Sequence, residues 1–278
     1  MQKFNYKNKE HIFDEKQVEE VLYLSFPLLE KTGLVKHGFS TRIGGVSEGI
    51  YSSMNLSFAR GDKEDAVWEN YRRMAKALGV KEDSFVFSAQ THTTHVHKVT
   101  AENREQQLQD VDGMITNVPG LCLVTSYADC VPLYFIDPVH KAIGLSHSGW
   151  RGTVGKIGAV TIQMMREAYG TDAADIIAAI GPSICQDCYE VSEDVIEQFK
   201  EAFHSKHWDD LFYQKENKKY QLNLWKANEI ILLEAGVKRE NIAVTNICTS
   251  CNSERLYSHR ASKGQRGGLA AFMALTEK

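Results

Sequence analysis

Two segments near the middle of the chain place a reactive side chain at the end of a buried strand. Cys130 lies in a turn between two apolar runs that are predicted to be strands. His147 ends a third apolar run, and a Gly-rich loop and a helix follow it. If the strands carrying Cys130 and His147 are neighbours, both side chains meet at one sheet edge. A thiolate beside an imidazole is either a nucleophile with its base or part of a metal site.

A cluster of three histidines, His92, His95 and His97, supplies further candidate ligands. Zinc prefers nitrogen and sulfur ligands, and catalytic zinc sites keep three protein ligands and one open position. One of these histidines would therefore complete a site with Cys130 and His147. In an extended segment His95 and His97 share one face, but spacing alone does not select among the three.

Four other cysteines form two C-x-x-C pairs, Cys185 with Cys188 and Cys248 with Cys251. Two such pairs are typical of zinc ribbons, but roughly 60 residues containing two predicted helices separate these two, far more than in a ribbon. The spacing therefore favours buried free thiols over a zinc shared by all four. Disulfides are not expected in a reducing cytosol.

Basic and hydroxyl side chains supply candidate anion-binding sites. Arg151, with Trp150 as a stacking surface, precedes a predicted helix, where backbone N–H groups favour anions. Ser258, Arg260 and Arg266 belong to a second basic loop near the C-terminus. This loop is either a phosphate-binding segment or an ordinary solvated charge cluster.

The elements that must position these residues alternate between helices and strands. Apolar periodicity and end signals predict helices at 65–79, 154–169, 192–203, 224–235 and 268–275. Apolar, β-rich runs predict strands at the start of 38–45 and at 85–87, 95–99, 121–125, 133–136, 142–145, 176–180 and 242–244. Several connections are too short for a crossover, so neighbouring strands must be antiparallel. We expect an α+β fold of mixed α/β layers, with mixed sheets flanked by helices.

The bulk properties narrow the class of protein. The chain has 278 residues, 43% hydrophobic and 24% charged, with only 5 prolines, which predicts one globular domain over 1–278. A formal net charge of -4 argues against a nucleic-acid-binding role. No apolar run reaches the ~18 residues of a membrane helix, and the polar N-terminus does not resemble a signal peptide. We therefore expect a cytoplasmic protein without membrane contacts.

A series of short motifs also follows the order found in one known family. They are 41–47, Asn55-Leu56-Ser57, Gln90-Thr91-His92, Asp112-Gly113, 128–132, 147–152, Gly181-Pro182, 248–252 and Ser258-His259-Arg260. From about Gly38 to Leu275 the chain resembles the multicopper polyphenol oxidase (laccase-like) family, whose members are regarded as purine nucleoside phosphorylases. The run around His147 is the most specific of these motifs.

The resemblance implies a cytotoxic-necrotizing-factor-like cysteine hydrolase fold and a zinc ion bound by His92, Cys130 and His147. It thereby selects His92 from the three histidines. It also implies phosphorolysis of adenosine, inosine and S-methyl-5′-thioadenosine, together with deamination of adenosine. The partners would then be a purine nucleoside and phosphate. Copper is an alternative metal, although multicopper sites need several His-rich motifs and the sequence shows only one compact His/Cys set.

Other residues receive roles as hypotheses. Arg42, Arg151 and Arg260 are candidate phosphate ligands because a guanidinium binds phosphate through two parallel hydrogen bonds. Asp129 would orient a ligand or act as a base, so we place it with the catalytic residues. Gln90, with Ser258 from the basic loop, would contact the substrate.

Three other functions remain open at this level. One is a metal-free cysteine hydrolase with Cys130 as nucleophile and His147 as base. The second is a copper-dependent polyphenol oxidase, and the third is a non-catalytic nucleotide-binding module. The chain is expected to be a monomer or a weak homo-oligomer.

Overall fold

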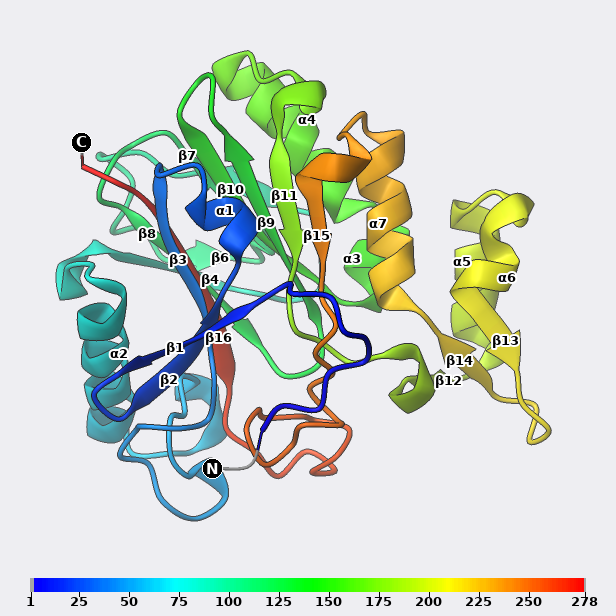
Figure 1. The fold of residues 1–278 in the computed structure, drawn as a ribbon, viewed down its shortest axis with the longest axis horizontal. Helices are drawn as coiled ribbons and strands as arrows, with labels where there is room; N and C mark the ends of the chain where they lie inside the picture. Colours follow the sequence, from blue (N-terminus) through cyan, green and yellow to red (C-terminus); the bar gives the residue numbers. More distant parts are fainter. Residues whose placement is uncertain (1–2, 278) are drawn as a thin grey trace.

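The structure is a computed structural model that describes residues 3–277. Two large β-sheets pack face to face, and helices cover both outer faces (Figure 1). A small third sheet projects to one side, at the right of Figure 1. Two stacked sheets with helices outside them confirm the expected mixed α/β layers.

The first large sheet has seven strands in the order β1-β2-β3-β16-β8-β4-β6. Their bounds are Asp14–Val18, Val21–Ser25, Val35–Ser40, Leu269–Leu275, Cys122–Tyr127, Phe85–Ala89 and Leu108–Gln109, in that order. The strands from β1 to β8 pair antiparallel, whereas β4 runs parallel to β8 and β6. The polar segment Asp14–Val18 forms the edge strand β1.

The second large sheet has six strands in the order β15-β11-β9-β10-β7-β5. Their bounds are Ile242–Val244, Ile177–Ile180, Val131–Asp137, Ala142–Ser148, Gly113–Thr116 and Val96–Lys98, in that order. The central strands β9 and β10 form an antiparallel hairpin, which confirms the inference from their short connection. Every residue of β9 and β10 is buried because the sheet is covered on both faces.

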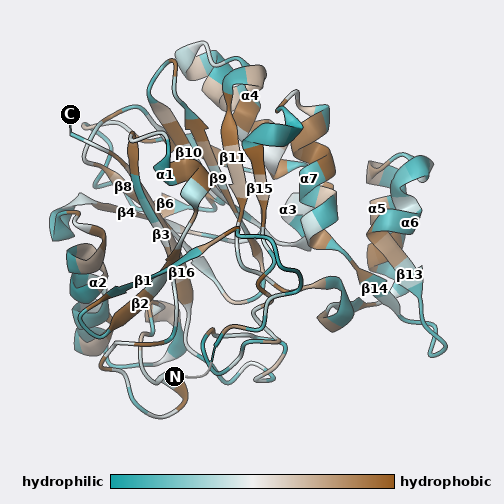
Figure 2. Ribbon diagram, viewed as in Figure 1, coloured by the Kyte–Doolittle hydropathy of each residue, from teal (hydrophilic) through white to brown (hydrophobic). Residues whose placement is uncertain are grey.

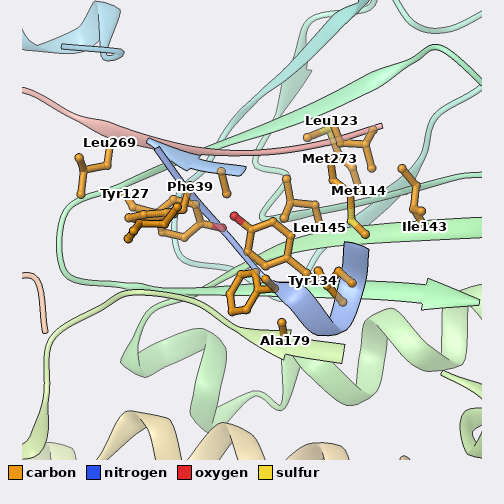
Figure 3. Packing of buried hydrophobic residues seen from close by; sticks show 14 of the residues in the cluster. Phe39, Met114, Leu123, Tyr127, Tyr134, Ile143, Leu145, Ala179, Leu269 and Met273 are labelled. Atoms are coloured by element: carbon orange, nitrogen blue, oxygen red, sulfur yellow. The ribbon is translucent and has the colours of Figure 1, made fainter. Parts of the chain in front are cut away.

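The main hydrophobic core fills the space between the two large sheets. Phe39, Leu123 and Met273 point inward from the seven-stranded sheet, and Tyr134 and Leu145 face them from the other (Figure 3). The Tyr134 hydroxyl also donates a hydrogen bond of 3.1 Å to the carbonyl of residue 38 in β3. The two sheets are therefore held together by apolar packing and by a buried polar contact.

Amphipathic helices complete the layers. Helix α2 (Glu64–Leu78) packs on the seven-stranded sheet, and α3 (Trp150–Val154), α4 (Ile157–Tyr169) and α7 (Leu224–Glu234) pack on the other. Figure 2 shows the hydrophobic residues gathered on the central strands and polar residues on the outward sides of the helices. The short helix α1 (Pro27–Glu30) contacts β3 and β11.

The projecting unit contains the small sheet β12-β14-β13 and two helices. The bounds are Glu190–Val191 for β12, Tyr220–Leu222 for β14, Phe212–Gln214 for β13, Glu193–Ala202 for α5 and Trp208–Leu211 for α6. Among the described residues, no helix combines the length and the apolar character needed to cross a membrane.

Most predicted helices are confirmed, with two local differences. The helix predicted at 154–169 is divided, because Lys156 adopts a left-handed conformation (φ 56°) between α3 and α4. Asn223 caps α7 by accepting a hydrogen bond of 3.1 Å from the Lys226 N–H. Ser192 occupies the N-cap position of α5, but its hydroxyl bonds to Asp194 instead of to a backbone N–H.

The helix predicted at 268–275 is wrong, because this segment forms strand β16. Its Leu, Ala and Met residues favour a helix when they are considered locally. The strand lies between β3 and β8, pairs with both, and is buried along its whole length. Pairing on both edges and burial of both faces therefore override the local helix preference.

Truncation of Phe272 tests the central role of β16. Phe272 is fully buried and packs against Tyr71 and Phe85. We expect Phe272→Ala to lower the free energy of unfolding by about 3–5 kcal/mol, measured by urea denaturation. The matched control is Tyr213→Ala, which removes a ring that is 49% exposed. Equal losses in the two variants would contradict the buried position of β16.

Candidate metal centre

The metal-binding candidates lie where the chain crosses between the two large sheets. The segment from β4 to β5 carries His92, and the turn from β8 to β9 carries Cys130. His147 lies near the end of β10, opposite Pro132 of β9. The ligand atoms of His92, Cys130 and His147 all lie within 4.8 Å of one another. The predicted convergence of Cys130 and His147 is confirmed.

The three ligands differ in their exposure to solvent. The Cys130 Sγ lies 3.8 Å from the His92 Nε2, and the ring centroids of His92 and His147 are 4.9 Å apart. His92 is exposed, Cys130 is half-buried and His147 is only 4% exposed. A metal ion held by all three would therefore face solvent on the His92 side, where a substrate can approach it.

The structure selects His92 from the histidine cluster. The His95 Nδ1 lies 3.1 Å from the carbonyl oxygen of Asp110, and the His97 Nε2 lies 3.2 Å from the Asn103 amide nitrogen. Among the residues described, His92 alone of the three belongs to a group of potential metal ligands. Spacing could not distinguish them, because His92 lies in a bend and has a positive φ of 67°.

Asp112 is the residue that organises this site, and the sequence interpretation gave it no role. Its buried Oδ1 accepts hydrogen bonds of 2.8 Å from the His147 Nδ1 and 3.0 Å from the His92 N–H. Its Oδ2 accepts from the N–H groups of Thr91 and Thr93 at 3.1 and 2.9 Å. These contacts hold the His92 bend and leave the His147 Nε2 free for a metal. The only signal was the Asp112-Gly113 motif.

The charges of the cluster favour a thiolate in the metal-free chain. Burial alone would raise the pKa of Cys130, but His147 and His92 outweigh it and lower the pKa to about 6. Burial alone would lower the pKa of His147, but Cys130 and Asp112 raise it to about 9. For Asp112, the hydrogen bonds from His147 and the 91–93 backbone outweigh burial and lower the pKa to about 2. A thiolate is the form of cysteine that binds metals, and a metal bound at this site would take the place of a proton on His147.

Asp129 directly precedes Cys130, but its side chain and its carbonyl accept hydrogen bonds from other loops of the protein. It has a φ of 92°, and its Oδ1 accepts a hydrogen bond of 2.6 Å from the Thr249 hydroxyl. Its Oδ2 accepts one of 2.7 Å from the Arg260 N–H, and its carbonyl accepts one from the Ile184 N–H. These contacts favour a positioning role over that of a base. Because Asp129 directly precedes Cys130, its bond to the Arg260 N–H holds the loop that carries Arg260 close to the site.

Two of the predicted substrate contacts bind the protein backbone. The Gln90 amide donates to the Ser126 carbonyl at 3.0 Å and accepts from the Ser126 N–H at 2.7 Å. This pair joins the ends of β4 and β8 next to the site. Ser258 is 2% exposed, and its hydroxyl accepts from the Ala261 N–H at 3.1 Å. Both contacts stabilise loops that surround the site, and contact with a substrate stays a prediction.

The three predicted phosphate ligands have different surroundings. The Arg42 guanidinium donates to the carbonyls of Ser52 and Ser253. The Arg260 guanidinium donates to the carbonyls of Cys188 and Glu190. Arg151 is exposed, and its Cζ lies 4.3 Å from the centroid of the Trp150 ring. Arg42 and Arg260 therefore tie loops together, whereas Arg151 presents its charge to solvent on an aromatic surface.

Arg266 is a further anion-binding candidate in the basic loop. It is 9% exposed, and its buried Nε has no hydrogen-bond partner among residues 3–277. Burial and the charge of Arg60 lower its pKa to about 10, against the opposing charges of Asp129 and Cys130. A buried, incompletely bonded guanidinium near Cys130 is suited to an anionic ligand. Arg60, the last residue of the short 3-10 helix Phe58–Arg60, gave no sequence signal because it belongs to no recognisable motif.

The chain belongs to the family described as multi-copper polyphenol oxidoreductase laccase, whose family model matches residues 36–276. This confirms the resemblance inferred from the motifs.

Similar proteins cover nearly the whole chain. It is 36% identical over 247 residues to the Bacillus subtilis (strain 168) protein named purine nucleoside phosphorylase YlmD, covering 86% of this chain and 88% of the relative. It is 35% identical over 246 residues to adenosine deaminase RL5 from an unknown prokaryotic organism, covering 84% and 93%. The crystal structure of YlmD from Geobacillus stearothermophilus matches with a TM-score of 0.89 at 32% identity, covering 96% of this chain and 99% of that one.

Gly149 provides a test of the site geometry. A Cβ at this position would lie 2.8 Å from the His92 Cδ2 and 3.2 Å from the Cys130 Sγ, although the backbone suits any residue. We expect Gly149→Ala to displace these ligands and to weaken metal affinity about 10-fold or more, measured by competition with a chromophoric chelator.

The matched control is Gly152→Ala in α3, where the nearest atom would lie 3.4 Å from the added Cβ. This variant should keep the metal affinity of the wild type. An unchanged affinity in Gly149→Ala would show that the metal lies elsewhere.

Proposed function

We propose that the protein is a zinc-dependent purine nucleoside phosphorylase that acts on adenosine, inosine and S-methyl-5′-thioadenosine and also deaminates adenosine. The observation that carries this proposal is the His92–Cys130–His147 cluster. Asp112 bonds to the His147 ring on the buried side of this cluster, and solvent reaches the cluster on the His92 side. The names of the relatives, purine nucleoside phosphorylase and adenosine deaminase, support a nucleoside-processing enzyme.

The ligands favour zinc over a multicopper centre. One thiolate and two imidazoles are nitrogen and sulfur donors that suit zinc and leave the open position of a catalytic site, and a single blue-copper ion takes the same donors. Within residues 3–277, the other group of potential ligands contains only cysteines, so it adds no His-rich copper motif. When bound, zinc would polarise a substrate atom or lower the pKa of a bound water to about 7. The chain's own contribution is to fix the three ligands, chiefly through Asp112.

Phosphorolysis needs an anion beside the nucleoside. A phosphate oxygen attacks C1′ of the ribose, the C1′–N bond breaks, and the purine leaves with the electron pair and takes up a proton. Arg266 would hold the phosphate, because its buried Nε has no hydrogen-bond partner among the described residues and its charge interacts with that of Cys130. Arg60, Arg151 and Arg260 would add positive charge, and the Trp150 ring offers a stacking surface for the purine.

Deamination would use the same His/Cys site with water as the nucleophile. Water adds to C6 of adenine, and ammonia leaves with the electrons of the C6–N bond, so that inosine results. This reaction needs no phosphate. The two activities should therefore respond differently to loss of a phosphate ligand, although both depend on the same His/Cys cluster.

A metal-free cysteine hydrolase is the second candidate, and the support for it is that Cys130, His147 and Asp112 follow one another in the order of a nucleophile, a base and an orienting carboxylate. Cys130 would be the nucleophile, His147 the base and Asp112 the group that orients it at 2.8 Å. This mechanism leaves no role for His92, which lies 3.8 Å from the same sulfur. Elemental analysis separates the two, because a metal-free preparation with full activity would support the hydrolase.

The remaining parts of the proposal concern the chain as a whole. We propose one domain over 1–278, related to the cytotoxic-necrotizing-factor-like cysteine hydrolase fold, in a cytoplasmic monomer or weak homo-oligomer. The core shared by the two large sheets supports the single domain.

Removal of the Cys130 thiol tests the proposed phosphorylase and deaminase activities. We expect Cys130→Ala to reduce both phosphorolysis and deamination of adenosine on the order of 100-fold or more, because it removes a metal ligand. The assay separates ribose-1-phosphate, adenine and inosine by chromatography. Cys122→Ala, which removes a buried thiol of β8 outside the site, should keep both activities. Equal product traces from wild type and Cys130→Ala would refute the site assignment.

Arg266→Gln tests the phosphate site. The variant keeps a hydrogen-bond donor but loses the charge, and a hydrogen bond to a charged group contributes about 1.5–3 kcal/mol. We expect the KM for phosphate to rise roughly 10- to 100-fold, whereas adenosine deamination without phosphate changes little. A parallel loss of both activities would indicate a structural role for Arg266 instead.

A further inference from the structure

The two C-x-x-C pairs, distant in sequence, meet in the fold. Cys185 and Cys188 follow β11, and Cys248 and Cys251 follow β15, which runs parallel to β11. An isolated parallel β-bridge between Ser183 and Cys248 continues the pairing of β11 with β15 as far as the cysteines. All four Sγ atoms lie within 4.8 Å of one another, a group that we call the four-cysteine cluster. The sequence spacing had favoured unconnected buried thiols.

The dimensions of the four-cysteine cluster suit a tetrahedral metal. With Zn–S bonds of about 2.3 Å, the sulfur atoms of a tetrahedral site lie about 3.8 Å apart. The observed separation between the Sγ atoms of Cys188 and Cys251 is 3.5 Å. An apolar shell that includes Ile184, Tyr189 and Trp225 packs around the cluster. Such a shell limits solvent access and so favours a structural metal over a catalytic one.

Two backbone N–H groups point at one sulfur atom of the cluster, the Cys248 Sγ. The Cys251 N–H donates to the Cys248 Sγ at 3.4 Å, and the Cys185 N–H donates to the same sulfur at 3.3 Å. These N–H···S contacts stabilise the charged form of a thiol, which is the form that binds metal.

A cation from the N-terminal segment also lies beside the cluster. The Lys7 Nζ forms an ion pair of 3.1 Å with Asp187, which stands between the first two cysteines, and its charge acts on Cys185 and Cys251. A divalent ion with four thiolates carries a net charge of about −2. Lys7 would offset part of that charge, and this contact ties the N-terminal segment to the cluster.

We propose that a zinc ion, separate from the one at the His/Cys centre, is bound by the four thiolates of Cys185, Cys188, Cys248 and Cys251. The ion joins two loops, and each loop also bonds to Asp129. The N–H of Ile184, which precedes Cys185, donates to the Asp129 carbonyl, and the hydroxyl of Thr249, which follows Cys248, donates to the Asp129 Oδ1. The Cys188 carbonyl also accepts a hydrogen bond from Arg260. The site is therefore structural, and it positions the loops beside Cys130.

The alternative occupant of this geometry is a disulfide between Cys188 and Cys251. It would consume two thiols, whereas zinc leaves all four available once the ion is removed. Alkylation in denaturant with a chelator and without reductant distinguishes the two. Modification of all six cysteines supports the zinc site, and protection of this pair overturns it.

The zinc content of purified protein gives the main test. We expect two zinc ions per chain in the wild type and in the control Cys122→Ser, and one in Cys251→Ser. His92→Ala should also hold one, because it loses only the ion of the His/Cys centre. If the proposed function fails and that centre binds no zinc, the wild type and His92→Ala both hold one ion and Cys251→Ser holds none. Wild-type zinc content in folded Cys251→Ser overturns the four-cysteine site.

X-ray absorption on His92→Ala supplies a test that does not require a cysteine variant to fold. The zinc that remains in this variant should have four sulfur neighbours at about 2.3 Å. A shell that contains nitrogen or oxygen, or a variant without any zinc, would overturn the proposal. The measurement is independent of enzymatic activity.

Discussion

The candidate site depends on one buried carboxylate. Asp112 accepts hydrogen bonds from the His147 ring and from three consecutive N–H groups of the 91–93 bend. It thus connects a rigid strand of one sheet to a loop that arrives from the other sheet. A charged carboxylate inside a protein is costly unless such donors surround it. The hydrogen bonds that keep Asp112 ionised are therefore the same bonds that hold His92 and His147 facing Cys130.

The two-sheet architecture explains why the ligands come from separate parts of the chain. β4 and β8 belong to the seven-stranded sheet, and the segments that follow them enter the six-stranded sheet. Each crossing must bend sharply, and the positive φ values of His92 and Asp129 mark these bends. The two bent segments, from β4 to β5 and from β8 to β9, bring polar side chains together at one end of the two sheets, outside the hydrophobic core. Here the strain coincides with the candidate metal site.

The sequence could predict those features that depend on local pattern and neighbouring strands. The apolar runs around Cys130 and His147 and the short connections predict strands with antiparallel neighbours, and the β9–β10 hairpin is what brings these two residues together. The choice of His92 depends on the bend held by Asp112, and the four-cysteine cluster depends on the parallel pairing of β11 with β15. Both are long-range contacts that residue spacing does not encode. The helix expected at 268–275 failed for the same reason, because pairing partners distant in sequence decide its conformation.

The unequal burial of the three ligands has a consequence for metal exchange. Solvent reaches His92, whereas His147 is buried and its Nδ1 is bonded to Asp112. In the proposed zinc enzyme, an ion would therefore enter and leave on the His92 side, with Cys130 and His147 bound to it from the buried side. A competing chelator would approach from the same side as the proposed nucleoside. A bound nucleoside would thus slow the loss of the metal.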